Sequence, residues 1–190
     1  MKYFVLAALC IGTASRLTAQ NPPPSSASSV GHIASRFLPA ELLSRLAERP
    51  EGMVDSMSFS SPVDSVWGAL KATISKYDLP IGFEERSNWQ LGNQGAKIYH
   101  RLGSNSVSNY LRCGDGPTGP NADNYVVYLT FLSVLRPNEG AGVALYTMIT
   151  GQAVDLAGGR NDPIVCSTTG RFEQEVGKQV AKVLAGKAKK

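Results

Sequence analysis

Residues 125–153 decide the fold. They read YVVYLTFLSVL (125–135), then RPNEGA (136–141), then GVALYTMITGQA (142–153). The first run is almost wholly β-branched, aromatic or aliphatic, which predicts a central strand buried on both faces. The second run contains proline, asparagine and glycine, which favour a turn, and the third predicts the antiparallel partner strand. A long hairpin is therefore expected at the centre of the domain.

Shorter extended segments precede and follow this hairpin. They are expected at residues 53–59, 81–84, 89–91, 97–100, 107–113 and 164–166. Two segments rich in glycine, proline and Asx residues, 114–124 and 154–162, are predicted loops.

Two helices are expected outside the run of strands. Ser61 and Pro62 predict a helix start with Ser61 as the N-cap and Asp64 as the reciprocal capping acid, and the helix ends near residues 78–80. A last helix begins near Gly170. The apolar stripes are Val63, Val66, Trp67, Leu70 and Ile74 in the first helix, and Phe172, Val176, Val180, Val183 and Leu184 in the last. This order predicts an α+β fold: an antiparallel sheet with an early helix and a C-terminal helix packed on one face, as a two-layer sandwich.

The N-terminal third is expected to lie outside this domain. Residues 1–19 have the pattern of a secretory signal peptide, with Lys2, an apolar run and Ala19 before the cleavage site. Residues 20–34 form a linker rich in proline and serine. The α+β domain is expected over 53–186, followed by a basic tail at 187–190.

Residues 35–50 have the pattern of a short amphipathic helix, with Leu42, Leu43 and Leu46 on one side. The segment could face a membrane, bind a partner or pack on the domain. Its spacing alone does not choose among these roles.

Composition excludes several classes of protein. Of the 190 residues, 43% are hydrophobic and 18% are charged, which is unlike collagen-like or strongly disordered chains. The sequence has no run of about 18 apolar residues, so no transmembrane span is expected in the mature chain. The net charge is +4, and it falls to +2 if Lys2 and Arg16 leave with the signal. No basic face with interleaved aromatic residues points to nucleic acid.

The signal peptide predicts export, so the periplasm or the extracellular space is expected, and both are oxidising compartments. Cys113 and Cys166 would remain after signal cleavage, and an even pair in an exported chain predicts a disulfide. Cys10 leaves open a lipid-anchored alternative, although Leu9 before it does not suit lipidation.

Two stretches resemble a group of exported bacterial domains that are mostly uncharacterised. Residues 65–70 (SVWGAL) with 77–80 (YDLP) resemble the first helix of that group, and Cys113-Gly114 with 166–173 (CSTTGRFE) resemble its closing segment. The layout is similar to the helix-grip domains of the outer-membrane assembly lipoprotein BamC. The resemblance implies a helix-grip-like fold and a periplasmic setting, and it carries no catalytic residues.

No motif for catalysis or for a cofactor stands out. The chain lacks a nucleophile elbow, a P-loop and a dinucleotide fingerprint. Acids of the two loops (Asp115, Asp123, Asp155, Asp162) would bind calcium only if the loops met, and their spacing does not match an EF-hand. Glu84 and Glu85 are adjacent on a strand, so they point to opposite faces and cannot act as a pair.

The two loops are the candidate interaction elements. They carry or border the residue types that anchor protein interfaces and several acids. The candidates are Tyr110, Arg112, Asp115, Asp123, Tyr125 and Arg160. The function expected first is a non-catalytic accessory or assembly subunit that binds another envelope protein. An apolar-ligand binder, with its ligand between sheet and helix, is the alternative. A hydrolase built around Asp115, Asp123 or His100 is the third reading.

Overall fold

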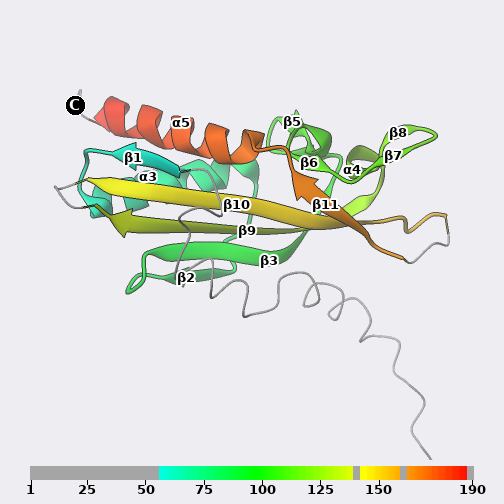
Figure 1. The fold of residues 1–190 in the computed structure, drawn as a ribbon, viewed down its shortest axis with the longest axis horizontal. Helices are drawn as coiled ribbons and strands as arrows, with labels where there is room; N and C mark the ends of the chain where they lie inside the picture. The colour runs from blue at the N-terminus through cyan, green and yellow to red at the C-terminus, as the bar shows by residue number, and fades with distance from the viewer. Residues whose placement is uncertain (1–55, 139–141, 159–161, 188–190) are drawn as a thin grey trace, which may run out of the picture.

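The protein is described by a computed structural model that covers residues 56–138, 142–158 and 162–187. Figure 1 shows one layer of strands with two long helices on the same side of it. The fold is therefore α+β, with a mostly antiparallel sheet, an early helix and a C-terminal helix in a two-layer arrangement, as the sequence predicts. The expected signal peptide, linker and short amphipathic helix lie outside the described residues, as does most of the basic tail.

The central hairpin consists of β9 (Val126–Pro137) and β10 (Val143–Val154), which pair along their whole lengths. The sheet order is β2-β3-β9-β10-β11-β6, and β1 also pairs with β10. The other strands of this sheet are β1 (Ser56–Phe59), β2 (Phe83–Glu85), β3 (Gln90–Tyr99), β6 (Leu111–Arg112) and β11 (Ile164–Thr168). The prediction of a central, largely buried strand at 125–135 is confirmed, because β9 lies between β3 and β10.

Two helices cover one face of the sheet. They are α3 (Val63–Ile74), extended by the short 3-10 helix η1 (Ser75–Tyr77), and α5 (Arg171–Lys187). The two helices contact each other, and α5 also contacts β10 (Figure 1). Their apolar stripes meet side chains such as Phe131 and Leu135 of β9 in one hydrophobic core. We call this face of the sheet the helix face, and the opposite one the outer face.

The segment between β3 and β9 carries small elements that close one end of the molecule. These elements are β4 (Arg101–Leu102), β5 (Asn105–Ser106), the 3-10 helix η2 (Val107–Asn109), β7 (Asp115–Gly116), β8 (Gly119–Pro120) and the short helix α4 (Asn121–Asn124). The predicted strand at 107–113 is therefore wrong in its first half. Val107 and Tyr110 are both buried, which a helical turn achieves because it places residues three apart on one side.

Three local expectations are corrected. Pro62, not Ser61, is the N-cap of α3, and it makes no side-chain cap hydrogen bond. Asp64 forms an ion pair with Arg86 instead of closing a capping box. The two strands expected at 89–91 and 97–100 are one strand, β3, because an irregularity between Asn93 and Ala96 lets the pairing with β9 continue.

None of the described helices is long and apolar enough to cross a membrane.

Candidate functional site

The two predicted loops meet in a groove at one end of the sheet, where β3 ends, β9 begins and β10 ends. The groove is open to solvent and has a volume of about 460 Å³. It is lined by Lys97, Tyr99, Asn124, Tyr125, Val126, Asp155, Leu156 and Ala157. Three segments far apart in sequence therefore build one surface, which we call the loop groove.

Exposed apolar side chains distinguish the loop groove. Tyr99 is 56% exposed and Leu156 is 59% exposed, although both are large hydrophobic residues. Tyr125, which also lines the groove, is half-buried. Lys97 and Asp155 add one positive and one negative group to the lining. Aromatic and aliphatic surface with a charged rim is typical of a protein-binding site.

Local hydrogen bonds order the loop that carries Leu156. Asp155 Oδ1 accepts hydrogen bonds from the backbone N–H groups of Ala157 (3.0 Å) and Gly158 (2.8 Å). This arrangement is an Asx turn, in which the side chain replaces a backbone acceptor. The turn holds the backbone on both sides of Leu156, so ordering this loop on binding a partner would cost less entropy.

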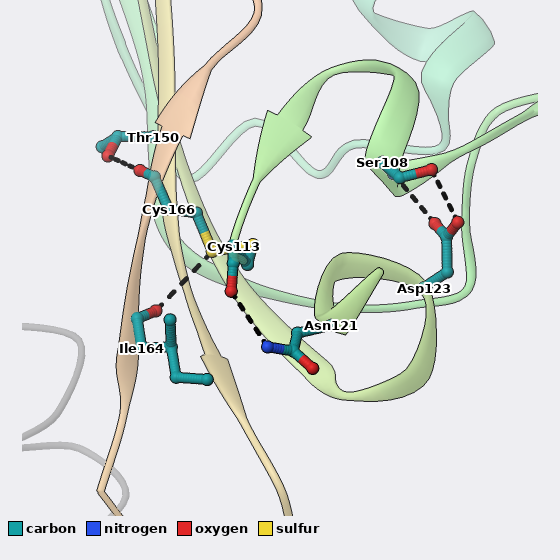
Figure 2. Close-up of a disulfide and its surroundings, with 7 residues drawn as sticks. All are labelled: Ser108, Cys113, Asn121, Asp123, Thr150, Ile164 and Cys166. Carbon is teal, nitrogen blue, oxygen red and sulfur yellow. Dashed lines mark hydrogen bonds between the residues drawn. A yellow bond between two sulfur atoms is a disulfide. The ribbon is translucent and has the colours of Figure 1, made fainter. Parts of the chain in front are cut away.

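A disulfide lies at the start of the segment that leads to Tyr125. Cys113 and Cys166 are bonded, as the sequence predicts, and link residues 53 apart. Figure 2 shows that the Asn121 side-chain amide donates to the Cys113 carbonyl (3.1 Å), and that the Thr150 hydroxyl donates to the Cys166 carbonyl (3.1 Å). The bond thereby ties the segment that leads into Tyr125 to strand β11.

The predicted interaction residues do not all lie in this groove. Tyr125 lines it, whereas Arg112 and Asp115 are exposed on β6 and β7 and are not among its lining residues. Tyr110 is fully buried, so its side chain belongs to the core and cannot anchor a partner. Arg160 lies outside the described residues.

Tyr110 is held by a polar cluster beneath the surface. Its hydroxyl donates to Glu175 Oε2 (2.8 Å) and accepts from Asn105 Nδ2 (2.7 Å). Burial alone would raise the pKa of Glu175, but hydrogen bonds from Arg171 and Tyr110 outweigh it and lower that pKa. Burial, the neighbouring Tyr110 and Glu175 together raise the pKa of Tyr77 well above its usual range. These interactions fasten α5 to η1 and to the β4–β5 segment.

Asp123 has a structural role in the same region. Its carboxylate accepts hydrogen bonds from the backbone N–H (2.8 Å) and the hydroxyl (2.6 Å) of Ser108, as Figure 2 shows. Its backbone carbonyl contacts His100 Nδ1. The carboxylate therefore joins α4 to η2.

The hydrogen bonds among Ser108, Asp123 and His100 are not those of a catalytic triad. A triad needs the imidazole between the hydroxyl and the carboxylate, so that it can take the hydroxyl proton. Here the Ser108 hydroxyl donates directly to the Asp123 carboxylate, and the His100 Nδ1 position is occupied by a backbone carbonyl. Within the described residues, no three His, Cys, Asp or Glu side chains are close enough to hold a metal ion.

Sequence reasoning missed Tyr99 and Leu156 as site residues. Leu156 is the largest aliphatic residue of the predicted loop at 154–162, and this is a signal that the sequence offers. The sequence predicts Tyr99 only as a strand residue, and only the pairing of β3 with β9 places it beside Val126.

No known protein-family model matches the chain, and a search of curated proteins finds no relative.

Proposed function

We propose that the protein is a non-catalytic periplasmic or secreted domain that binds another envelope protein, as an accessory or assembly subunit, through the loop groove. The observation that carries the proposal is the pair of exposed side chains, Tyr99 and Leu156, in an ordered groove of about 460 Å³. A groove of this size can accept apolar side chains of a partner, with Lys97 and Asp155 in its lining available for polar contacts.

The disulfide supports the proposed setting. Such bonds persist in oxidising compartments and are rare in the reducing cytosol. The resemblance to exported helix-grip domains adds the expectation of a periplasmic setting. Lipid anchoring at Cys10 stays the alternative to free export.

The cavity next to the last helix gives little support to the apolar-ligand alternative. The structure shows a cavity of about 50 Å³ between β1, β10 and α5, lined by residues such as Met57, Leu145 and Gly177. Ligand pockets usually enclose roughly 300–1,000 Å³. A ligand held between the sheet and the last helix therefore has little support, and we favour partner binding at the loop groove.

A comparison of variants tests the proposal. Native membranes would be cross-linked to the tagged chain carrying Tyr99→Ser with Leu156→Ser, and retained proteins identified by mass spectrometry. The matched control is Val165→Ser, because Val165 is 67% exposed and is not among the groove lining. We expect one retained envelope protein with wild type and control that the double variant loses.

The purified partner then provides the decisive measurement. We expect the double variant to weaken its binding at least about tenfold, as loss of hot-spot side chains does. Equal affinity of the double variant and the Val165→Ser control would overturn the groove as the binding site. A small lipophilic molecule in native mass spectra of the wild type, lost in the double variant, would favour the ligand-binding alternative.

A further inference from the structure

The outer face of the sheet carries a second apolar cluster, separate from the main core. Leu132 and Val134 of β9 pack there with Phe83 of β2 and Met148 of β10. They point away from α3 and α5, because side chains alternate along a strand and Phe131 belongs to the helix-face core. We call these four residues the outer cluster.

The outer cluster has the burial of a covered face. Leu132 is 3% exposed and Val134 is 1% exposed. Both described long helices pack on the opposite face of the sheet (Figure 1). A sheet face that is open to water normally carries polar, partly exposed side chains. Exposures this low, on apolar side chains, indicate a further layer over this face.

An unsatisfied amide on the same face agrees with this inference. Gln152 is 1% exposed and pairs across from Tyr128, on the side of β10 that also carries Met148. Neither its side-chain nitrogen nor its oxygen has a hydrogen-bond partner among the described residues. Buried polar groups nearly always have partners, so a covering layer with polar groups is expected near Gln152.

Residues 35–50 have the chemistry of such a layer. Leu42, Leu43 and Leu46 share one side of a helix by their spacing, whereas Glu41, Arg45 and Glu48 fall on another side. Pro39 favours the first turn of a helix, so a helix over residues 39–48 would be roughly 15 Å long, at about 1.5 Å per residue. Four adjacent strands span about 14 Å, so the helix is long enough to cross the outer cluster.

The connection to the described domain is also long enough. The chain enters the sheet at Ser56, which pairs with Tyr146 of β10. Val134 lies opposite Tyr146 on the next strand, β9. Reaching a layer above Val134 requires roughly 14 Å, from two strand spacings of about 4.8 Å and a layer spacing of about 10 Å. The six residues 50–55 can span about 20 Å.

We propose that residues 35–50 form a helix that docks on the outer face of the sheet, with Leu42, Leu43 and Leu46 against the outer cluster. The two-layer domain then gains a third layer from its own N-terminal segment. This assignment chooses packing on the domain over the membrane-facing and partner-binding roles that the sequence leaves open. It does not depend on the loop groove.

Two methionines on opposite faces of the sheet provide the test. Met148 lies in the outer cluster, whereas Met57 packs against Gly177 of α5 on the helix face. Peroxide converts an accessible methionine to its sulfoxide, which peptide mass spectrometry quantifies. The rates at both positions would be measured in the full mature chain, for wild type and for a variant with Leu42→Ser, Leu43→Ser and Leu46→Ser.

We expect a several-fold faster oxidation of Met148 in the leucine variant and an unchanged rate at Met57. The matched control carries Glu41→Ser, Arg45→Ser and Glu48→Ser, which introduces the same number of serines on the other side of the segment. Its Met148 rate should equal that of wild type. If the oxidation of Met57 is also faster in the leucine variant, single substitutions replace the triple variants. Leu46→Ser is then the test variant and Arg45→Ser its control.

Two results would overturn the proposal. Equal Met148 rates in wild type, leucine variant and control would show that residues 35–50 do not cover the cluster. Protection of Met148 that disappears when the wild-type protein is diluted would assign the covering layer to a second copy of the chain.

Discussion

The carboxylate of Glu173, on α5, accepts a hydrogen bond from the backbone N–H of Ile149 in the middle of β10 (3.2 Å). β1 pairs with residues 143–146 of β10, and β11 pairs with residues 151–153 on the same edge. Between these two strands, a helix side chain takes the place of a strand partner. The same carboxylate accepts from the Thr168 hydroxyl (2.8 Å), so Glu173 joins α5, β10 and β11.

Replacing Glu173 should therefore destabilise the whole domain. Glu173→Ala leaves the buried Ile149 N–H without this acceptor, which costs about 1–3 kcal/mol in the free energy of unfolding. Glu173→Gln keeps one acceptor oxygen and should lose less. Urea denaturation measures both, with the exposed neighbour Gln174→Ala as a control that stays within about 0.5 kcal/mol of wild type. Equal midpoints for Glu173→Ala and Gln174→Ala would contradict this role.

Removing the disulfide should lower stability without changing the fold. Cross-linking two residues 53 apart restricts the unfolded chain, and the loop-entropy model assigns this about 4 kcal/mol. The Cys113→Ala, Cys166→Ala double variant should denature at a clearly lower urea concentration than the oxidised wild type. Reductant should lower the urea midpoint of the wild type and leave the midpoint of the double variant unchanged. A wild-type midpoint that does not respond to reductant would mean that the bond contributes nothing to stability.

Stability should fall in alkaline solution because of Tyr77. Burial raises the pKa of its hydroxyl above the ordinary value of 10.0, so the unfolded chain releases this proton first. The contribution is therefore fully present below about pH 10 and is lost as the pH rises above it. Tyr77→Phe removes the titrating hydroxyl but retains the ring, which packs edge-on against Phe172 with the two ring centroids 5.1 Å apart. Between pH 9 and pH 11, the free energy of unfolding of this variant should decline less steeply than that of wild type. The difference in slope should correspond to the release of at most about one proton on unfolding. If the free energies of unfolding of wild type and Tyr77→Phe decline in parallel, Tyr77 does not cause the loss of stability in alkaline solution.

Gly92 should not tolerate a side chain. A methyl group there would lie 2.4 Å from the Phe131 carbonyl oxygen and 2.7 Å from the Phe83 ring. The backbone oxygen cannot move without disturbing the β3–β9 pairing, so Gly92→Ala should destabilise by about 1–3 kcal/mol. Gly186→Ala is the control, since no atom lies within 4 Å of its added methyl and alanine favours a helix. A stability for Gly92→Ala within experimental error of wild type would show that the sheet can adjust there.

The sequence by itself determined the main elements. A run of apolar β-formers interrupted by one turn, over residues 125–153, predicts a hairpin whatever surrounds it, and β9 and β10 form it. The apolar stripes of α3 and α5 were equally readable, because a period of 3.6 residues is a local property. The cysteine pair followed from residue type and compartment, and the bond between Cys113 and Cys166 is present.

Only the tertiary structure decided which residues meet. The loop groove combines residues near positions 99, 125 and 156, and no local pattern relates them. The sequence makes Tyr110 a candidate interaction residue, yet the packing of Phe172 against it places it in the core. The register between strands and the contacts between layers depend on the simultaneous burial of distant segments. For that reason the hairpin could be predicted from residues 125–153 alone, whereas the groove and the outer cluster could not.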